Sequence, residues 1–395
     1  MQSQTRVVAA LGSAQTLAWG SSYYLPAILA NPMAAELGLG TAWVFIAFSC
    51  GLLISATLGP MSGRLIDAYG GRRVLPVSNA IFALGLALLG CASDAAWLFG
   101  SWLVLGVAMS CGLYESAFAT VARIYGQDAR RAITGITLIA GFASTIAWPL
   151  TAWMEVSFGW RFACFAWSAA HLLICAPLNL LVPTGGRIVS ATSEAAAPLT
   201  ERGRTWITVA LAFVFTATWF VSTAMAAHLP RLLQEAGASL PAAIAAAALV
   251  GPAQVAGRIV EFGLMRRLHP LTSARVASMA HPLGAGVLLS VGAPAASVFT
   301  VIHGAGNGVM TIANGTLPLH FFGAGGYGLR QGLLMMPAKI LQAAAPFLFD
   351  LLLTQFGTAA LGATAALGVA SCLVLCVLPR TGVRAAARSR GRDGR

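Results

Sequence analysis

Among the ionisable side chains inside long apolar runs of this 395-residue sequence, Glu115, His281, His303 and Lys339 are the candidates for chemistry. A buried carboxylic acid holds its proton more tightly, and a buried lysine loses its proton more readily, whereas arginine scarcely does. Because a charged group is costly in an apolar setting, each is expected to face a cavity or a polar partner. These residue types predict reversible proton binding, and Lys339, the sole lysine, also predicts an anion site.

Some of these residues have a second interpretation. Glu115 and Lys339 can instead form a fixed ion pair with each other. Gln342 stands on the face adjoining Lys339 in the same run, and is a further candidate for solute contact. His281 precedes Pro282, so it marks either the binding path or a kink with a satisfied buried polar group. His171 lies alone in another run and is expected to be packed or hydrogen-bonded.

Polar and aromatic residues also recur at helical spacing near the start of the chain. Gln15, Trp19 and Tyr23 are four residues apart and would form one stripe on a helix. Such a stripe is unfavourable against lipid, so it should face other helices or water. A solute contact and a helix-packing seam both fit this pattern.

The segment HGAGNGVMTIANG is the most unusual run in the second half. It places His303, Asn307 and Asn314 among four glycines. Glycines weaken a helix and expose backbone carbonyls, which a membrane tolerates only where protein or water satisfies them. We therefore expect a binding segment here, with close helix packing by small residues as the alternative.

No constellation for catalysis occurs in the sequence. It has no nucleophile with a base, no His/Cys set at metal-ligand spacing and no nucleotide-binding loop. Seven cysteines, all in or at the ends of apolar runs, imply no disulfide framework. We predict no catalytic residues, no metal, no cofactor and no enzymatic activity.

The composition places these residues in a membrane. Hydrophobic residues make up 58% and charged residues 9%, with a mean hydropathy of +0.79, whereas soluble domains carry about 25% charged residues. A net charge of +12 is explained by orientation of basic loops towards the cytoplasm, and we expect no nucleic acid partner. Twelve spans are expected, at about 7–31, 41–62, 74–93, 97–121, 132–154, 161–182, 205–229, 240–262, 271–291, 295–318, 331–353 and 358–379.

A charged motif occurs twice between these spans. GRLIDAYGGRR at Gly63–Arg73 is answered by GRIVEFGLMRR at Gly257–Arg267, at one offset of 194 residues. The matching positions are Gly63, Arg64, Asp67, Arg72 and Arg73 in the first copy and Gly257, Arg258, Glu261, Arg266 and Arg267 in the second. A repeat at nearly half the chain length indicates that one multi-span unit occurs twice, as in secondary transporters.

The first copy resembles the loop signature of the major facilitator superfamily, although Ala68 stands where a basic residue often follows the aspartate. The resemblance implies that Gly63, Asp67, Arg72 and Arg73 brace the inward-closed bundle. By residue type, Gly63 permits close helix approach, while Asp67 can accept hydrogen bonds from arginines or from a helix amino terminus. The segment ARIYGQDARRAITGITLIAG at 122–141, shortly after Glu115, resembles the fourth-to-fifth-span region of the monocarboxylate and oxalate-formate branches of that superfamily.

These observations predict an all-α membrane protein of twelve transmembrane helices in two six-helix pseudo-symmetric bundles. The expected domains are an N-terminal bundle at 1–182, a cytoplasmic linker at 183–204, a C-terminal bundle at 205–379 and a basic tail at 380–395. Arginine-rich loops on one side place both termini in the cytoplasm, in what we expect to be a bacterial inner membrane. Membrane lipids are expected partners, and the functional unit is expected to be a monomer.

The expected function is secondary active transport of a small organic anion with protons, by alternating access. Efflux of a toxic small molecule, such as a drug or an arsenite-like species, is the alternative. A membrane receptor that binds its ligand without moving it, or a membrane-embedded enzyme, would belong to a different class. The absence of a soluble signalling domain and of catalytic groups disfavours both.

Overall fold

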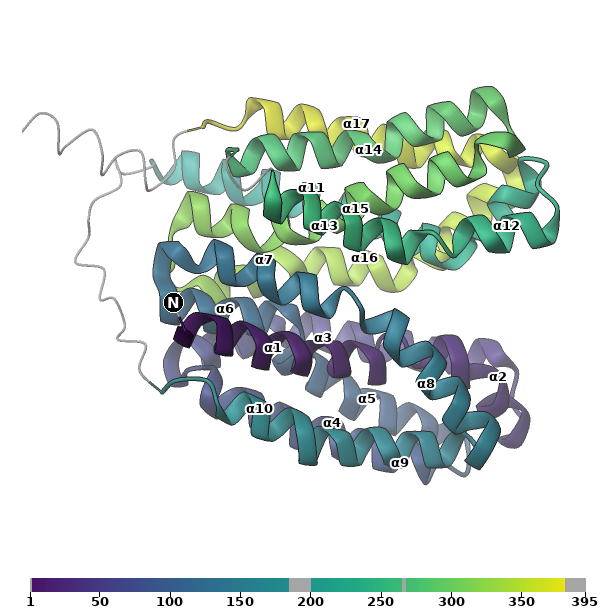
Figure 1. The fold of residues 1–395 in the computed structure, drawn as a ribbon. Coiled ribbons are helices and arrows are strands. Elements are labelled where there is room, and N and C mark those ends of the chain that lie inside the picture. The colour runs from purple at the N-terminus through teal and green to yellow at the C-terminus, as the bar shows by residue number, and fades with distance from the viewer. Residues whose placement is uncertain (1, 185–199, 265–267, 381–395) are drawn as a thin grey trace, which may run out of the picture. The chain divides into compact units, whose positions relative to one another are not determined.

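A computed structural model describes residues 2–184, 200–264 and 268–380 (Figure 1). These residues form helices joined by short turns, and none of them is in a β-strand. The expected all-α class is therefore confirmed for the described part of the chain. The chain divides into two compact units, and each is described by itself.

Unit 1 comprises the described part of Met1–Val189 together with Ala324–Met336. Its α-helices are α1 (Gln2–Ser21), α2 (Pro26–Glu36), α3 (Thr41–Tyr69), α4 (Gly71–Gly90), α5 (Ala95–Gly112), α6 (Tyr114–Tyr125), α7 (Ala129–Ala140), α8 (Ala143–Phe158), α9 (Trp160–Ala170) and α10 (Ala176–Leu180). A π-helical turn, His171–Cys175, joins α9 to α10. In the core, α5 packs between α3 and α4, with Trp102 and Phe82 fully buried.

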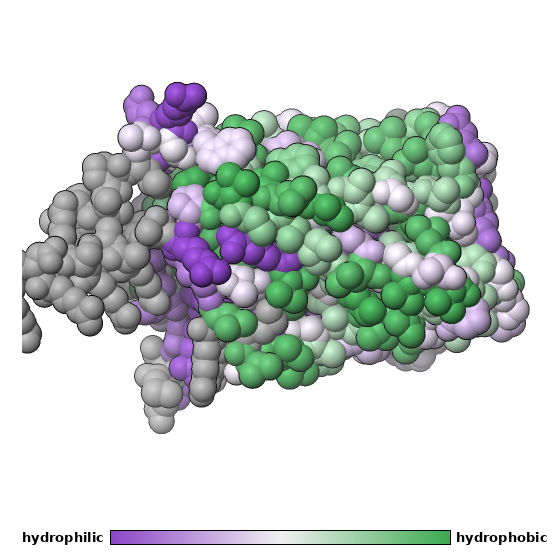
Figure 2. All heavy atoms as spheres, turned by 90° about the horizontal axis from the view of Figure 1, so that it is seen from above, coloured by the Kyte–Doolittle hydropathy of each residue, from purple (hydrophilic) through white to green (hydrophobic). Residues whose placement is uncertain are grey.

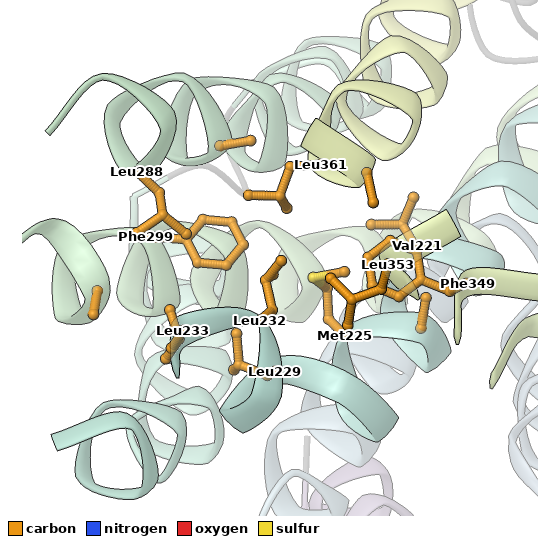
Figure 3. Close-up of a cluster of buried hydrophobic side chains, with 14 of the residues drawn as sticks. Val221, Met225, Leu229, Leu232, Leu233, Leu288, Phe299, Phe349, Leu353 and Leu361 are labelled. Atoms are coloured by element: carbon orange, nitrogen blue, oxygen red, sulfur yellow. The ribbon is translucent and has the colours of Figure 1, made fainter. Parts of the chain in front are cut away.

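Unit 2 comprises the described part of Ser190–Gly323 together with Pro337–Arg395. Its helices are α11 (Glu201–Glu235), α12 (Leu240–Ala247), α13 (Val250–Gly263), α14 (Pro270–Val291), α15 (Ala296–Phe322), most of α16 (Tyr327–Phe356), and α17 (Ala360–Val377). α15 packs against both α13 and α14. A cluster of buried apolar side chains joins these helices, and Figure 3 shows Phe299 beside Leu288 within it.

Helix α16 runs from one unit into the other. Its first residues, up to Met336, belong to unit 1, and the rest, from Pro337, belongs to unit 2. Pro337 lies inside the helix at this junction, and Pro346 lies inside it further on.

Within the described residues, eight helical segments are long and apolar enough to cross a membrane. They are Thr41–Tyr69, Gly71–Gly90, Ala95–Phe158, Trp160–Leu180, Glu201–Glu235, Leu240–Gly263, Ala293–Phe322 and Tyr327–Val377. Ala95–Phe158 and Tyr327–Val377 each contain more than one helix. The protein is therefore a multi-pass membrane protein, while the count of twelve spans remains a prediction.

The outward-facing side chains suit lipid. Val156 and Leu173 are 82% and 76% exposed, which is unfavourable in water but normal against hydrocarbon. Figure 2 shows hydrophobic residues over most of the visible surface, with hydrophilic residues gathered towards its two ends.

Several expected continuous spans are interrupted, and this corrects the sequence interpretation. The run expected at 7–31 divides into α1 and α2, and that at 97–121 divides at Leu113, whose backbone is extended (φ −88°, ψ −167°). The run at 132–154 divides between Ala140 and Ala143, and that at 240–262 between Ala247 and Val250. Hydropathy reveals the apolar length of a run but not a local break in its backbone, since tertiary contacts satisfy the freed groups.

The domain boundaries expected from the sequence fall partly outside the described residues. Most of the linker at 183–204 is not described, and α11 already begins at Glu201. Of the basic tail at 380–395, only Arg380 is described.

Candidate functional site

In unit 1, the carboxylate of Asp67 binds the start of α16. Its Oδ1 accepts a hydrogen bond from the backbone N–H of Gly328 at 2.9 Å, and its Oδ2 accepts one from the N–H of Leu329 at 2.9 Å. The first N–H groups of a helix lack partners within the helix, and the helix dipole favours negative charge at this end. Asp67 therefore acts as a charged cap that ties the end of α3 to the beginning of α16.

Gly63 allows this approach. A Cβ atom on Gly63 would lie 2.0 Å from the carbonyl oxygen of Gly328, closer than any real contact permits. Only a residue without a side chain fits between the two backbones. This agrees with the close helix approach expected from the sequence.

Two arginines hold the same end of unit 1. Arg123, on α6, donates from Nη1 to the backbone carbonyl of Asp67 and from Nη2 to that of Ala68 at 3.5 Å. Arg72 donates from Nη1 to the carbonyl of Val182 at 3.2 Å. Arg64 and Arg73 are exposed.

The second copy of the motif packs differently. A Cβ on Gly257 would lie 2.3 Å from the carbonyl oxygen of Ala305, so here the close partner is α15 within unit 2. Arg258 and Glu261 are buried, at 5% and 2% exposed. Arg266 and Arg267 lie outside the described residues.

A break in the helical backbone forms the second candidate site of unit 1. α5 ends at Gly112 and α6 begins at Tyr114, which leaves the carbonyl of Gly112 outside a regular helix. The side chain of Gln15, on α1, donates from Nε2 to this carbonyl at 2.6 Å. Gln15 is 2% exposed, and its Oε1 has no hydrogen-bond partner among the described residues.

Aromatic side chains surround the break. The ring of Trp19 lies 5.2 Å from that of Tyr23 and 4.9 Å from that of Tyr114, and Tyr114 stacks on Phe118 at 5.3 Å. The predicted stripe of Gln15, Trp19 and Tyr23 is therefore assembled, and it meets the segment that carries Glu115. Amide and π faces of this kind can hold a small organic solute by hydrogen bonding and stacking.

Glu115 lies in the first turn of α6 and is partly buried. Tyr327, at the start of α16 in the same unit, has a fully buried side chain. The alternative partner proposed from the sequence, Lys339, belongs to unit 2. The ion pair between these two groups remains a prediction.

Unit 2 contains a pair of buried histidines. Nδ1 of His281, on α14, lies 3.1 Å from Nδ1 of His303, on α15, and the two rings meet edge to face. The other ring nitrogen of His281, Nε2, lies 2.9 Å from Oγ1 of Thr364 on α17. Phe299, labelled in Figure 3, stacks on His303 with ring centroids 5.9 Å apart.

The histidine pair borders a cavity of about 40 Å³, counted as the space open to the centres of water molecules. Its polar lining includes Thr218, Ser278, Asn307 and Ser371 in addition to the two histidines. Asn307 also donates from Nδ2 to Oγ of Ser222 at 2.9 Å. The polar residues that line this cavity can form hydrogen bonds, and Asp, Glu, Lys and Arg are absent from its lining.

The other predicted residues of unit 2 are buried. With its amide oriented to satisfy both neighbours, Asn314 accepts from Nε1 of Trp219 at 3.0 Å and donates to the carbonyl of Met310 at 3.3 Å. Lys339 and Gln342, both on α16, are 9% and 4% exposed.

His171 is fully hydrogen-bonded, as the sequence suggested. Its Nδ1 lies 2.9 Å from Oδ1 of Asn79, its Nε2 lies 2.8 Å from Oγ of Ser21, and its ring stacks on Phe82. Both nitrogens are thus used inside unit 1, which indicates a structural role.

Sequence reasoning missed several partners in these sites. The amides of Gly328 and Leu329 carry no side-chain signal, and only the glycine-rich stretch before α16 hints at a helix start. Thr364 is one of two hydroxyl residues within an apolar run, the other being Ser371. Arg123 was visible as a charge, but its binding to the Asp67 carbonyl depends on how α6 packs.

Comparison with known proteins places this fold in a family. A family model described as Major Facilitator Superfamily matches residues 11–296. The chain belongs to the Major Facilitator Superfamily. It is thus a member of a family of transporters and not an enzyme.

Among solved structures, the human organic anion transporter MFSD10 aligns with a TM-score of 0.72 at 18% identity, covering 94% of this chain and 99% of that one. The proton:xylose symporter XylE aligns with a TM-score of 0.73 at 11% identity, covering 96% of each chain. At these identities the likeness shows the fold alone.

Curated relatives match over shorter stretches. A facilitated glucose transporter, solute carrier family 2 member 10 of Mus musculus, is 31% identical over 154 residues, which is 36% of this chain and 27% of the relative. Monocarboxylate transporter 14 of Homo sapiens is 29% identical over 147 residues, 36% of this chain and 28% of the relative. The chain matches about a third or less of the length of these relatives.

Proposed function

We propose that the chain is a secondary active transporter that moves a small organic solute across a membrane by alternating access. The observation that carries this proposal is the binding of the Asp67 carboxylate to the amides of Gly328 and Leu329. These two bonds attach the end of α3 to the start of α16, and they can break and re-form without unfolding either helix. A contact of this kind stabilises one conformational state relative to another, which is what alternating access requires.

Replacing Asp67 with Asn tests this role. An amide has only one acceptor oxygen and no negative charge, so the cap on α16 weakens. The conformational state that contains this contact then loses stability. We expect the rate of solute counterflow in liposomes to fall by about tenfold or more, which corresponds to about 1.4 kcal/mol, with a smaller change in apparent affinity.

A matched control is available in the same unit. The carboxylate of Asp94 accepts a hydrogen bond from the backbone N–H of Trp97 and caps α5. Asp94→Asn removes the same negative charge from a helix start away from α16, so it should leave the counterflow rate nearly unchanged. Equal turnover with shifted affinity in Asp67→Asn would contradict the proposed role.

For the solute, we propose a small organic anion moved together with protons. The support is Lys339, the sole lysine of the sequence, which is 9% exposed on a helix of the membrane region. In an apolar setting a cationic lysine attracts an anion strongly. Lys339→Gln should abolish binding of charged analogues, such as a short monocarboxylate, while a neutral analogue of the same shape still binds. Unchanged binding of both would exclude this site.

A neutral hydroxylated solute is the second candidate. It is favoured by the break between α5 and α6, where Gln15 leaves Oε1 available as an acceptor beside the rings of Trp19 and Tyr114. The names of some relatives concern glucose and sucrose. Parallel counterflow with labelled lactate and labelled glucose separates the two candidates, because only the transported class exchanges.

The direction of transport and the class of protein are tested in the same vesicles. We propose a plasma-membrane location with both termini in the cytoplasm, and a functional monomer. Imposed pH gradients of either sign would distinguish uptake from efflux of a toxic compound. A ligand that binds to the protein yet never exchanges across the vesicle would instead indicate a receptor.

A further inference from the structure

The direction of the hydrogen bonds around the histidine pair can be derived from its last member. Thr364 has one hydroxyl proton, and Oγ1 donates it to the backbone carbonyl of Leu361 at 3.0 Å. A carbonyl oxygen can only accept. Towards His281, Thr364 is therefore an acceptor, and His281 must donate from Nε2.

This assignment fixes the tautomers of both rings. A neutral imidazole carries one N–H, so His281 with a proton on Nε2 has an unprotonated Nδ1. Nδ1 of His303, 3.1 Å away, must then donate to it. The proton of His303 lies on Nδ1, and its Nε2 is left as a bare acceptor. The reverse direction would lose the bond from Thr364 to Leu361.

The cavity lined by His303 can hold water molecules that could bond to its unprotonated Nε2. His303 is 4% exposed and lines the space of about 40 Å³ described above, and Nε2 has no hydrogen-bond partner among the described residues. One water needs about 10–15 Å³ of such space, so a few waters fit. A bare acceptor beside water is a site where a proton can bind.

We propose that His303 is a proton-binding site of unit 2, taking a proton at Nε2 from water in this cavity, with His281 and Thr364 as positioning residues. In the binding step, hydronium transfers its proton to the Nε2 lone pair and leaves as water. The proton on Nδ1 stays in place, so no hydrogen bond of the chain is broken. The cation then donates to Nδ1 of His281 through a charge-assisted bond, which stabilises it.

Few other charged groups oppose or replace this site. The helices that pack against α15 are chiefly α11, α12, α13 and α14. α12 has no ionisable residue, the charges of α11 stand near its two ends, and α13 and α14 contribute Arg258, Glu261 and Arg275. None of these lines the cavity, and the titratable group facing His303 is His281. α17 carries Cys372 and Cys376, which do not line the cavity either.

His171 provides an internal comparison. It is also buried, but both of its ring nitrogens are engaged, by Asn79 and Ser21. Binding a further proton at its Nε2 would require the Ser21 hydroxyl to turn away, towards the carbonyl of Ala18. The contrast between the two residues therefore tests the importance of the free nitrogen rather than burial alone.

Nitrogen NMR of the full chain, labelled with ¹⁵N-histidine, tests the proposal. Six histidines give signals, and those of His303 and His281 are identified by their loss in His303→Gln and His281→Gln. At neutral pH we expect His303 to carry its proton on Nδ1, and on acidification its Nε2 should change from unprotonated to protonated. The ring of His171 should not change over the same range. A proton on Nε2 of His303 at neutral pH, or no response before unfolding, would overturn the proposal.

Thr364→Val is a second variant of nearly the same shape. It removes the acceptor for Nε2 of His281, so nothing then fixes the direction of the hydrogen bonds between His281 and His303. We expect His303 to change from one tautomer to a mixture of both. An unaltered tautomer of His303 in this variant would refute the positioning role of Thr364.

The role of this proton in transport rests on the proposed function and is measured separately. In liposomes, His303→Gln should lose the dependence of solute accumulation on a pH gradient. If the NMR result holds while accumulation remains pH-dependent, His303 binds a proton that is not coupled to transport. If the unsubstituted protein exchanges no solute at all, the proposed function fails while the proton site stands.

Discussion

At the scale of single residues, buried polar groups in this protein are satisfied by partners far away in the sequence. Gln15 binds the carbonyl of Gly112, 97 residues on, and His171 binds Ser21, 150 residues back. Lipid offers no hydrogen bonds, so each buried polar group must find a protein or water partner. The sequence shows that such partners must exist, but not which residues they are.

Gln15→Leu should destabilise the protein, because it leaves the carbonyl of Gly112 without its partner at the break before α6. Losing one partner of a buried hydrogen bond costs about 1–3 kcal/mol. Thermal unfolding in detergent measures the effect. Gln234→Leu is the control, since that exposed amide only bonds to the carbonyl of Pro230 in its own helix and its loss should be nearly neutral.

Glu36 gives a prediction about pH. Hydrogen bonds from the Arg161 guanidinium at 2.9 Å and from the Trp160 indole lower the pKa of Glu36 below its ordinary value. A lowered folded-state pKa means that the bond stabilises the protein above the unfolded pKa, about 4.3, and that this contribution disappears as the pH falls through the folded value.

Glu36→Gln should therefore lower the melting temperature slightly at pH 7 and not at strongly acidic pH. Since the side chain of Glu36 is 51% exposed, solvent screening limits the effect to no more than about 1 kcal/mol. Glu155→Gln, at a residue with no ion pair among the described side chains, is the control. A deficit in Glu36→Gln that stays constant with pH would contradict this assignment.

At the scale of helices, positions without side chains decide which elements meet. Gly63 lies so close to the start of α16 that a methyl group does not fit. The sequence predicted close approach at Gly63 from the motif, yet it did not identify the partner helix. The break at Leu113 was not predicted, because leucine is common within helices and the extended backbone there is held by contacts from α1.

Gly63→Ala should displace the first turn of α16 and weaken the bonds to Asp67. Overpacking of this kind costs about 1–3 kcal/mol. Gly100→Ala in α5 is the matched control, because a Cβ there meets nothing within 4 Å. Hydrogen exchange of the amides of Gly328 and Leu329 should rise in the first variant and not in the second, and equal protection in both would speak against the model of a tight contact.

At the scale of the whole molecule, the duplicated motif predicts two bundles, whose bounds remain a prediction, and the described chain divides into two compact units. Their boundary is not a simple cut between halves, because Ala324–Met336 belongs to unit 1 although it follows most of unit 2. Repeats and hydropathy are local or periodic signals, so they reveal duplication and span length. The membership of this one segment depends on tertiary contacts, such as that of Asp67 with Gly328, which no periodicity encodes.

The proposed orientation is tested with reporters. An enzyme that is active only in the cytoplasm, fused after Arg395, should be active in cells, and a reporter active only outside should be silent there. Insertion of the same pair after Gly38, in the turn after α2, should give the opposite result. Matching signals at the two positions would refute the orientation derived from the arginine-rich loops.

The proline at the junction of α16 has a mechanical consequence. Pro337 has no N–H, so the carbonyl of Leu333 one turn earlier lacks its usual helical hydrogen bond. The pyrrolidine ring also crowds this carbonyl. The helix is therefore more compliant there than along its regular turns. In a continuous rigid helix, a movement of one end would displace the other end as well. Because α16 can bend at Pro337, its first turn can detach from Asp67 while the rest of the helix keeps its packing. Pro337→Ala restores the missing backbone hydrogen bond and should stiffen the helix. The first turn of α16 should then detach from Asp67 more slowly, which would be measured as slower hydrogen exchange of the Gly328 amide.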